Sequence, residues 1–300
     1  MKHLLLLLFI AVTLRGEEHD PAKGIIFCAY NVRNYLGDDQ TAPADHRAKP
    51  KTEKEIEALI TVIKDINPDI LGVSEMGSPK MFEDFKARLE KAGLVFKDSE
   101  YLQAGDPDRH VALLSRFPIV ARNSTKHVTF TLDGKDLEMK RGILDATVQI
   151  TPEYQLRCVG VHLKSKLPTP EGEALIRRHE AAKLREHLDA VLTAAPETNL
   201  ICYGDCNDTK NEPMFAEITG AKGTPTHMSD LWAKDSVGDR WTHYWKFADQ
   251  YSRIDYLFVS PGLWPETRRE TATVYRSPNW FDASDHRPIF VTIVPVEKSR

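Results

Sequence analysis

The sequence predicts an α/β (α+β) fold in which two mixed β-sheets pack face to face with helices outside them. Short apolar runs rich in β-branched residues recur along the chain, and longer segments with a 3.6-residue apolar period lie between several of them. Strands and helices in this arrangement are typical of layered α/β architectures. With 300 residues, 41% of them hydrophobic, the chain can bury one large core, so we expect a single domain over residues 22–296.

The predicted central strands carry polar residues at or near their ends. The apolar runs cover residues 24–30, 70–74, 156–161, 200–203 and 254–259. The polar residues that follow them or lie within them are Asn31, Glu75, His162, Asp205, Asn207 and Asp255. Because neighbouring strands of a sheet end along a common border, we expect these polar side chains to lie together at one such edge of the sandwich.

Longer segments between the strands have helical periodicity. They cover residues 53–66, 80–92 and 172–194. We expect these helices to cover the outer faces of the sheets. Residues 128–132 and 137–139, joined by Asp133-Gly134, predict a β-hairpin with a type I′ turn, since Asp-Gly suits the positive φ angles of that turn.

Two other long segments lack periodicity. Residues 37–51 are charged and contain two prolines, which predicts a mobile loop. Residues 220–250 are rich in Trp, His and Tyr, which predicts a long surface excursion near the mouth of a site, where substrate specificity could lie.

Residues 1–16 have the profile of a signal peptide, with an approximate boundary. Lys2 precedes an unbroken apolar stretch over residues 4–12, and the chain turns polar from Arg15. The stretch is well short of the roughly 18 residues expected of a membrane-spanning helix. The profile predicts an exported protein, periplasmic or secreted. The alternative is that these residues form a buried first strand or helix of the domain.

The four cysteines are not expected to form a disulfide framework, although export would permit one. They are Cys28, Cys158, Cys202 and Cys206. Most lie inside apolar runs, where a free cysteine behaves as a small buried hydrophobic residue. A zinc site at Cys202 and Cys206 is not expected either, because no Cys/His pair with ligand spacing accompanies them.

Two segments combine side chains suited to phosphoester chemistry. A Gly-Asp-x-Asn turn places Asp205 and Asn207 on one loop after a predicted buried strand. Residues 283–288 set Asp285 beside His286 just before a final apolar run. Phosphoester hydrolysis needs a base for water, a metal ion and donors for the developing negative charge, which such groups can supply. Either segment alone could be an ordinary turn, since Gly, Asp, Asn and Ser are common turn residues.

The ordered set of these residues resembles the endonuclease/exonuclease/phosphatase superfamily, which includes pancreatic deoxyribonuclease, apurinic endonucleases, neutral sphingomyelinases and inositol polyphosphate 5-phosphatases. The resemblance covers about residues 24–294, and residues 109–118 and 252–256 add further motif matches. The pattern is most similar to the deoxyribonuclease and neutral sphingomyelinase branches. It implies a DNase-I-like four-layer sandwich and a divalent-metal-dependent hydrolase of phosphodiesters.

The resemblance implies a catalytic role for each matching residue. His286 corresponds to the general base that takes a proton from water, and Asp255 to the carboxylate that orients its imidazole. Asp205 and Asn207 correspond to residues that contact the nucleophile and a phosphoryl oxygen. His162 corresponds to a donor to the phosphate, although a purely structural histidine at a sheet edge is the alternative.

The resemblance also implies a metal site. Glu75 corresponds to the carboxylate that binds Mg²⁺, Asn31 to an amide that orients a phosphate or a metal-bound water, and Asp285 to a carboxylate that binds metal or steadies the site. The expected ion is Mg²⁺, and Mn²⁺ or Ca²⁺ could substitute. The alternative for Glu75 is a strand-end residue that faces solvent.

The substrate class follows less directly. An exported nuclease is the leading interpretation, for which Arg33, Arg141 and Lys164 are candidate substrate-binding cations, although a solvated charged face is equally ordinary. A phospholipid or sphingomyelin-type phosphodiesterase, or a phosphatase, is the alternative, and a non-catalytic binding module is a remote one. The expected partner is a phosphodiester, in nucleic acid or a phospholipid head group, and no stable protein partner is implied. The formal net charge of −4 does not indicate a strong nucleic-acid binder.

The sequence departs from the pattern of the apurinic endonucleases. Arg33 stands where they have an Asp, and His162 stands where they have a Tyr. Repair of abasic sites is therefore not expected. The extended signature of the inositol phosphatases around the Gly-Asp-x-Asn turn is also missing.

Overall fold

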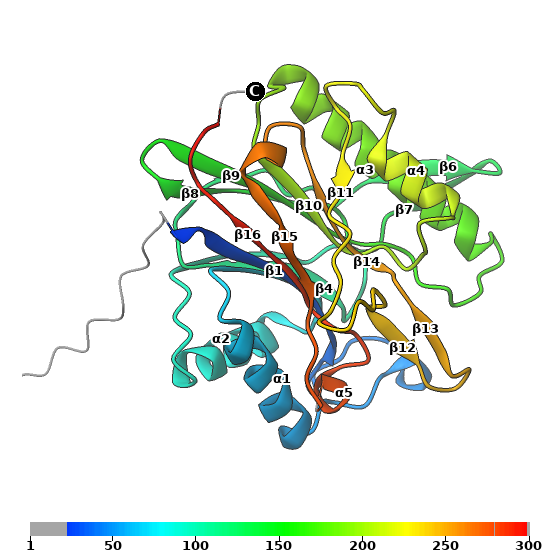
Figure 1. The fold of residues 1–300 in the computed structure, drawn as a ribbon. Helices are drawn as coiled ribbons and strands as arrows, with labels where there is room; N and C mark the ends of the chain where they lie inside the picture. The colour runs from blue at the N-terminus through cyan, green and yellow to red at the C-terminus, as the bar shows by residue number, and fades with distance from the viewer. Residues whose placement is uncertain (1–22, 279, 299–300) are drawn as a thin grey trace, which may run out of the picture.

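The computed structural model describes residues 23–278 and 280–298, and it contains two six-stranded sheets packed face to face with helices outside (Figure 1). The α/β sandwich expected from the sequence is confirmed. The predicted signal peptide, residues 1–16, lies outside the described residues. Within the described ranges no helix is both long enough and apolar enough to cross a bilayer.

The first sheet has the order β15-β16-β1-β2-β4-β3. Its strands are β15 (Thr267–Val274), β16 (Ile289–Ile293), β1 (Ile25–Tyr35), β2 (Ile70–Met76), β4 (His110–Ser115) and β3 (Asp98–Leu102). The central pair β1 and β2 is parallel, and the other pairs are antiparallel. A parallel pair needs a crossover connection, which helix α1 supplies here.

The second sheet has the order β11-β14-β10-β9-β8-β5. Its strands are β11 (Ser229–Asp230), β14 (Asp255–Val259), β10 (Leu200–Asp205), β9 (Tyr154–His162), β8 (Leu144–Thr151) and β5 (Ile119–Arg122). Again the central pair, β9 and β10, is parallel and its neighbours are antiparallel. Helix α3 supplies the crossover from β9 to β10.

The two sheets approach each other closely around Tyr203. Its ring leaves β10 of the second sheet and meets β2 of the first, where a Cβ placed on Gly72 would lie 2.0 Å from Tyr203 Cε2. A Cβ on Gly160 in the neighbouring strand β9 would lie 2.6 Å from the Tyr203 hydroxyl. Phe27 packs edge-on against the same ring at 5.0 Å between centroids. Both glycines therefore make room for one large buried side chain at the centre of the sandwich.

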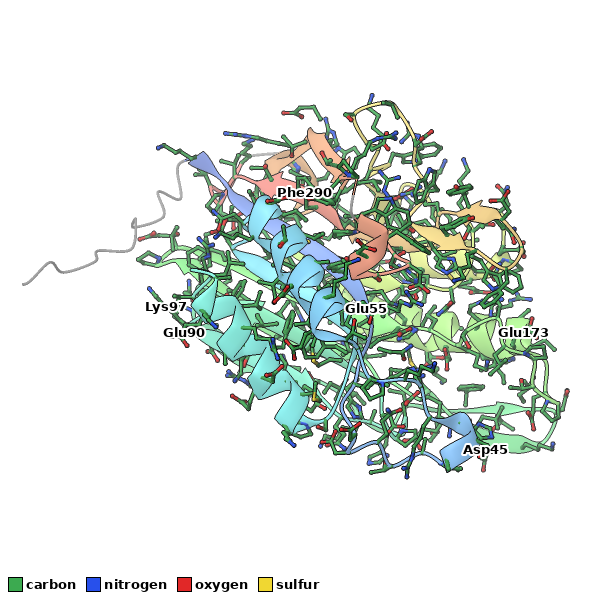
Figure 2. All side chains as sticks on the ribbon, turned by 90° about the horizontal axis from the view of Figure 1, so that it is seen from below. Asp45, Glu55, Glu90, Lys97, Glu173 and Phe290 are labelled. Atoms are coloured by element: carbon green, nitrogen blue, oxygen red, sulfur yellow. The ribbon has the colours of Figure 1, made fainter. Side chains whose placement is uncertain are left out.

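Helices cover the outer face of each sheet, as predicted. They are α1 (Glu53–Ile66), α2 (Pro79–Lys91), α3 (Glu173–Ala194), α4 (Pro213–Thr219) and α5 (Trp280–Ala283). Helices α1 and α2 lie over the first sheet, where Figure 2 labels Glu55 and Glu90 on them. Helices α3 and α4 pack on the second sheet. Short 3-10 turns occur at Ala44–His46 and Trp264–Glu266. The two sheets and the helices on their outer faces form the four layers.

Helix α1 shows why the sequence forms these elements. Thr52 and Glu55 form a reciprocal capping box at its start, which satisfies backbone N–H groups that have no partner within the helix. Ile56, Leu59 and Ile63 then repeat at the helical period and are buried against the sheet. Burying each such side chain contributes about 1.5–3 kcal/mol.

Two small hairpins project from the sandwich. Strands β6 (Thr129–Leu132) and β7 (Lys135–Glu138) pair through the predicted two-residue turn, in which Asp133 and Gly134 both have positive φ. Strands β12 (His243–Trp245) and β13 (Gln250–Ser252) form the second hairpin. Its first strand and β11 both fall within residues 220–250, so part of the predicted surface excursion is regular structure.

The charged segment over residues 37–51 is held by several hydrogen bonds, although the sequence predicted a mobile loop. The Asp108 carboxylate accepts hydrogen bonds from the backbone N–H groups of Thr41 and Ala42. The amide of Gln40 bonds to Gly37 and Ala48, which closes the segment on itself. All four cysteines are free and buried, as expected.

Candidate active site

The register of the second sheet places three of the predicted residues side by side. Asp205, the last residue of β10, lies opposite His162 of β9 and opposite Asp255 of β14. All three are nearly fully buried. Residues that face each other across adjacent strands have Cβ atoms about 4.5–5.5 Å apart, so the pairing itself brings these groups together.

The first sheet contributes Asn31 and Glu75 at the same edge. The register of β2 against β4 shifts between Ser74 and Met76, so Glu75 sits at a bulge with a φ of 63°. Bulges re-aim side chains, and a left-handed conformation at a non-glycine residue costs about 1–3 kcal/mol. In this position the Glu75 carboxylate accepts hydrogen bonds from Asn31 Nδ2 at 3.2 Å and from the Asn34 backbone at 2.9 Å.

Asn31 joins the two sheets at the site. Its Nδ2 also donates to Asp205 Oδ2 at 2.9 Å, and its Oδ1 accepts from the Arg33 backbone at 2.9 Å. One buried amide therefore fixes the carboxylates of Glu75 and Asp205 relative to each other.

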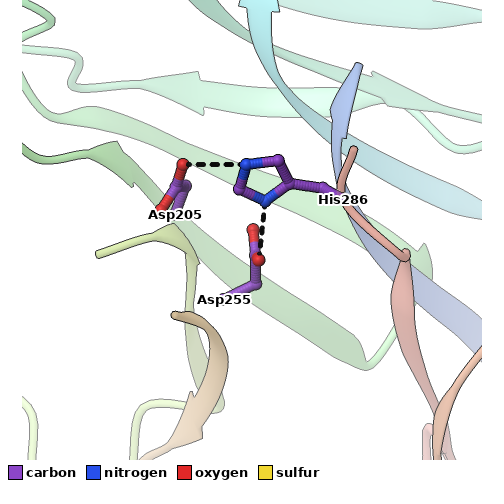
Figure 3. Close-up of side chains that lie close together, drawn as sticks. All are labelled: Asp205, Asp255 and His286. Atoms are coloured by element: carbon purple, nitrogen blue, oxygen red, sulfur yellow. Dashed lines mark hydrogen bonds and ion pairs between the residues drawn. The ribbon is translucent and has the colours of Figure 1, made fainter. Parts of the chain in front are cut away.

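His286 enters from the segment before β16. Ser284 positions this segment, because its hydroxyl donates to the Asn31 carbonyl at 2.8 Å and accepts from the His286 backbone at 3.0 Å. His286 Nδ1 lies 2.9 Å from Asp255 Oδ2, and its Nε2 lies 3.7 Å from Asp205 Oδ2 (Figure 3). The imidazole is thus held between two carboxylates from neighbouring strands.

The buried charges change the proton affinities of this group. Burial, and then repulsion from Asp255, raise the pKa of Asp205 to about 7. Burial alone would lower the pKa of His286, but the negative charges of Asp255 and Asp205 outweigh it and raise that pKa to about 10. His162, whose Nε2 lies 3.6 Å from Asp205 Oδ2, behaves in the opposite way: burial, and then the charge of Arg141, lower its pKa well below the usual value.

Asn207 and Asp285 lie at the rim. Asn207 has a φ of 53°, its backbone donates to Asp205 at 2.8 Å, and its amide Nδ2 donates to the Leu163 carbonyl at 3.0 Å. Asp285 is partly exposed and pairs with Arg33 across 3.6 Å. The structure therefore gathers the predicted catalytic and metal residues at one edge of the sandwich.

The predicted substrate-binding cations already have partners. Arg141 is nearly buried and pairs with Asp106 at 3.1 Å. The ammonium of Lys164 donates to the carbonyls of Ser165 and Leu167. Arg33 remains about two-fifths exposed beside Asp285.

Two further residues support the site and were not singled out for it. The Thr242 hydroxyl accepts hydrogen bonds from the backbones of Ile254 and Asp255, both at 3.1 Å, which fixes the start of β14. The ring of His243 packs on that of His286 at 4.6 Å between centroids, and the two residues form an isolated β-bridge. The sequence around them has no periodicity or motif that marks either residue.

The donor set fits a hard divalent cation. Glu75 offers carboxylate oxygens beside the Asn31 amide, and Asp285 offers another carboxylate next to Arg33. Mg²⁺ prefers such oxygen ligands while it keeps several waters. Asp205, Asp255 and His286 also have ligand atoms within 4.8 Å of one another. In that second group, however, the Asp255–His286 hydrogen bond is the arrangement of an oriented catalytic histidine.

An α/β sandwich with an Asp–His–Asp group and oxygen donors at one edge has the groups expected of hydrolases that act on phosphoester bonds. Residues 28–286 match the Endonuclease/Exonuclease/phosphatase family, and the chain belongs to this family. No curated protein matches the sequence significantly.

Solved structures of the same fold accompany this match. The human Nocturnin catalytic domain with bound sulfate anion is 17% identical with a TM-score of 0.62, over 91% of this chain and 94% of that one. Truncated Caenorhabditis elegans TDP2 is 17% identical with a TM-score of 0.55, over 90% and 96%. Sphingomyelinase C from Streptomyces griseocarneus is 13% identical with a TM-score of 0.59, over 90% and 99%. At these identities the similarity shows the DNase-I-like fold.

Proposed function

We propose that this chain is a divalent-metal-dependent phosphodiesterase, with Mg²⁺ as its ion and Mn²⁺ or Ca²⁺ as substitutes. The observation that carries the proposal is the Asp255–His286–Asp205 group. Asp255 holds His286 Nδ1 at 2.9 Å, so Nε2 is directed toward Asp205. The 3.7 Å gap to Asp205 exceeds a direct hydrogen bond and leaves Nε2 able to contact a water.

In this proposal His286 Nε2 takes the proton from the attacking water. Asp255 stabilises the imidazolium that forms, and Asp205 orients the water. His162, kept neutral by burial, donates a hydrogen bond to a phosphoryl oxygen, and Asn207 contacts another.

Glu75, Asn31 and Asp285 would hold the metal ion. Its positive charge would stabilise the charge that develops on the phosphoryl oxygens, and it would offset the carboxylates that raise the pKa of His286. The neutral imidazole needed for proton abstraction would then be favoured.

We propose that the substrate is nucleic acid and that the protein acts as an exported nuclease. A second candidate is a phospholipid, because Trp245 and Phe247 at the β12–β13 hairpin are 52% and 86% exposed, as in segments that contact a membrane interface. A protein of the same fold is named sphingomyelinase C. Turnover of plasmid DNA, RNA, sphingomyelin and inositol phosphates by one purified sample would separate these candidates.

The reaction class is tested with bis-p-nitrophenyl phosphate. We expect hydrolysis with Mg²⁺ or Mn²⁺, and its loss on addition of EDTA. A folded protein that shows no hydrolysis with any of these ions, or the same rate with EDTA, would contradict the proposal and favour a binding module.

We also propose that the chain is exported, periplasmic or secreted, on the profile of residues 1–16. Expression of the full chain should give a product whose mass corresponds to cleavage near residue 16. A product of uncleaved mass that stays in the cytoplasmic fraction would contradict this.

A further inference from the structure

A cluster of cations surrounds one exposed indole next to the candidate active site. Trp232 is 47% exposed and follows β11, which pairs with β14 at the edge of the second sheet (Figure 1). The Lys210 ammonium lies 4.1 Å from its ring centroid, and the guanidinium carbons of Arg240 and Arg253 lie at 4.9 and 5.8 Å. Cations within about 6 Å of an indole face are attracted by its negative π surface.

Only part of this positive charge is neutralised. Arg253 forms a two-pronged ion pair with Asp230, whose side chain is only 4% exposed, and this pair holds the guanidinium in place. Arg240 donates to the Trp232 carbonyl. Across residues 23–278 and 280–298, neither Lys210 nor Arg240 forms an ion pair with an acidic side chain. The cluster therefore carries two unneutralised cations on the surface of a chain whose net charge is −4.

The cluster adjoins the reaction centre along two chain segments. Lys210 follows Asn207 by three residues, and Arg253 precedes Asp255 by two. Such segments span at most about 11 and 7 Å. The cluster is thus close enough to contact the substrate on one side of the cleaved phosphate.

We propose that Lys210 and Arg240, held on the indole of Trp232, bind the phosphate next to the one that is cleaved, so that the preferred substrate is a nucleic-acid strand with several phosphates in series. This inference rests on the proposed phosphodiesterase function. Two unneutralised cations attract a neighbouring phosphate, whereas they repel the positive group of a choline-type head group, which has only one phosphate. Two other candidate cations, Arg141 and Arg33, are already paired with the carboxylates of Asp106 and Asp285.

The test compares a dinucleotide, which has no neighbouring phosphate, with a single-stranded octanucleotide. In the double variant Lys210→Gln/Arg240→Gln, we expect the octanucleotide KM to rise at least about tenfold, because hydrogen bonds to charged groups contribute enough for such a factor. The slope of log KM against log salt should fall by about 1.4 for two lost phosphate contacts to a single strand. The dinucleotide kcat/KM should fall less than threefold. Trp232→Leu, which keeps both cations but removes the indole that holds them, should give a smaller rise in the octanucleotide KM.

Arg268→Gln/Arg269→Gln is the matched control. It removes two exposed charges, and Arg269 also lies over an exposed indole, that of Trp264, at 4.3 Å. This pair lies away from the candidate site along the first sheet. It adjoins Thr267, which pairs with Ile293 of β16, and Ile293 pairs with Ile25 at the start of β1, whereas Asn31 lies further along that strand. The control should leave both KM values unchanged.

An octanucleotide KM and salt slope that match the parent would overturn the inference while leaving the phosphodiesterase proposal intact. So would a parent that prefers anionic phospholipid vesicles and a double variant that loses only vesicle hydrolysis. If the parent cleaves no phosphodiester, the proposed function is wrong. In that case, fluorescence anisotropy of a labelled octanucleotide still tests whether Lys210 and Arg240 bind phosphate. Equal Kd values for the parent and the double variant would overturn the proposed subsite.

Discussion

The Asp205 carboxylate lies where the two sheets and His286 meet. Its Oδ2 accepts from Asn31 of the first sheet at 2.9 Å and lies 3.7 Å from His286 Nε2. Asp255 holds the other side of the imidazole. Because this negative charge is buried, it favours the imidazolium strongly, so the proton affinity of His286 depends on both carboxylates.

This dependence predicts the pH profile. Asp255 and Asp205 raise the pKa of His286 above its ordinary 6.5, to about 10, and only the neutral imidazole accepts a proton. The rate should therefore rise with pH. A bound metal ion offsets part of the negative charge, so at saturating Mg²⁺ the midpoint should lie between these two values. A log-rate profile that is flat from pH 5 to 8 with saturating metal would contradict the role of His286.

Asp255→Asn separates the charge from the hydrogen bond. Removing one of the charges that raise the pKa should move the rising limb to lower pH. Loss of imidazolium stabilisation should also lower kcat by roughly 10²- to 10⁴-fold. Rates measured from pH 5 to 10 on both proteins check this. An unshifted limb would show that Asp255 does not set the proton affinity of His286.

The sequence was informative where a functional residue ends a regular strand. Asp205 and His162 could be expected at one edge, because each follows a short apolar run. Thr242 and His243 could not, because their contacts with Asp255 and His286 are set by tertiary structure alone. For Arg141, the sequence shows the cation but not Asp106, its partner in another loop.

At the scale of elements, the packing of β2 against β10 predicts a strong effect of one methyl group. Gly72→Ala would place its Cβ 2.0 Å from the Tyr203 ring, and that ring is buried and enclosed by Gly160 as well. We expect the free energy of unfolding to fall by about 1–3 kcal/mol, as for other overpacked cores. Thermal or urea unfolding measures this.

Gly105→Ala is the control for that substitution. Its Cβ would meet Glu138 Oε2 at 3.6 Å, which is ordinary van der Waals contact. It should leave stability within about 0.5 kcal/mol of the parent. Equal stability of the Gly72→Ala and Gly105→Ala proteins would show that the sheets are less tightly packed around Tyr203 than described.

The positions of helices and turns could be predicted from local sequence patterns more readily than the pairing of strands. Helix α1 has the predicted bounds, Glu53–Ile66, because its capping box and apolar period are local signals. The turn at Asp133-Gly134 is local too. The bulge at Glu75 was not predicted, because it depends on how β2 pairs with β4. At this bulge the Glu75 carboxylate accepts a hydrogen bond from Asn31.

For the whole molecule, the sandwich itself assembles the site. Each sheet has a central parallel pair, β1 with β2 and β9 with β10, and the polar ends of both pairs meet at one edge. The first sheet supplies the proposed metal carboxylate Glu75 and, from the segment before β16, His286, whereas the second sheet supplies Asp205 and Asp255. The proposed proton abstraction therefore depends on residues from both sheets.

We propose that Glu75 holds the metal ion and that His286 abstracts the proton. The most direct measurement is the Mg²⁺ dependence of kcat for Glu75→Gln and His286→Ala, with melting temperatures to confirm that both variants are folded. Glu75→Gln should need more Mg²⁺ and recover part of its rate as Mg²⁺ increases. His286→Ala should lose about 10²- to 10⁴-fold in kcat at every Mg²⁺ concentration. If both variants melt like the parent and Glu75→Gln keeps the parent's Mg²⁺ dependence, or added Mg²⁺ restores His286→Ala, the claim is contradicted.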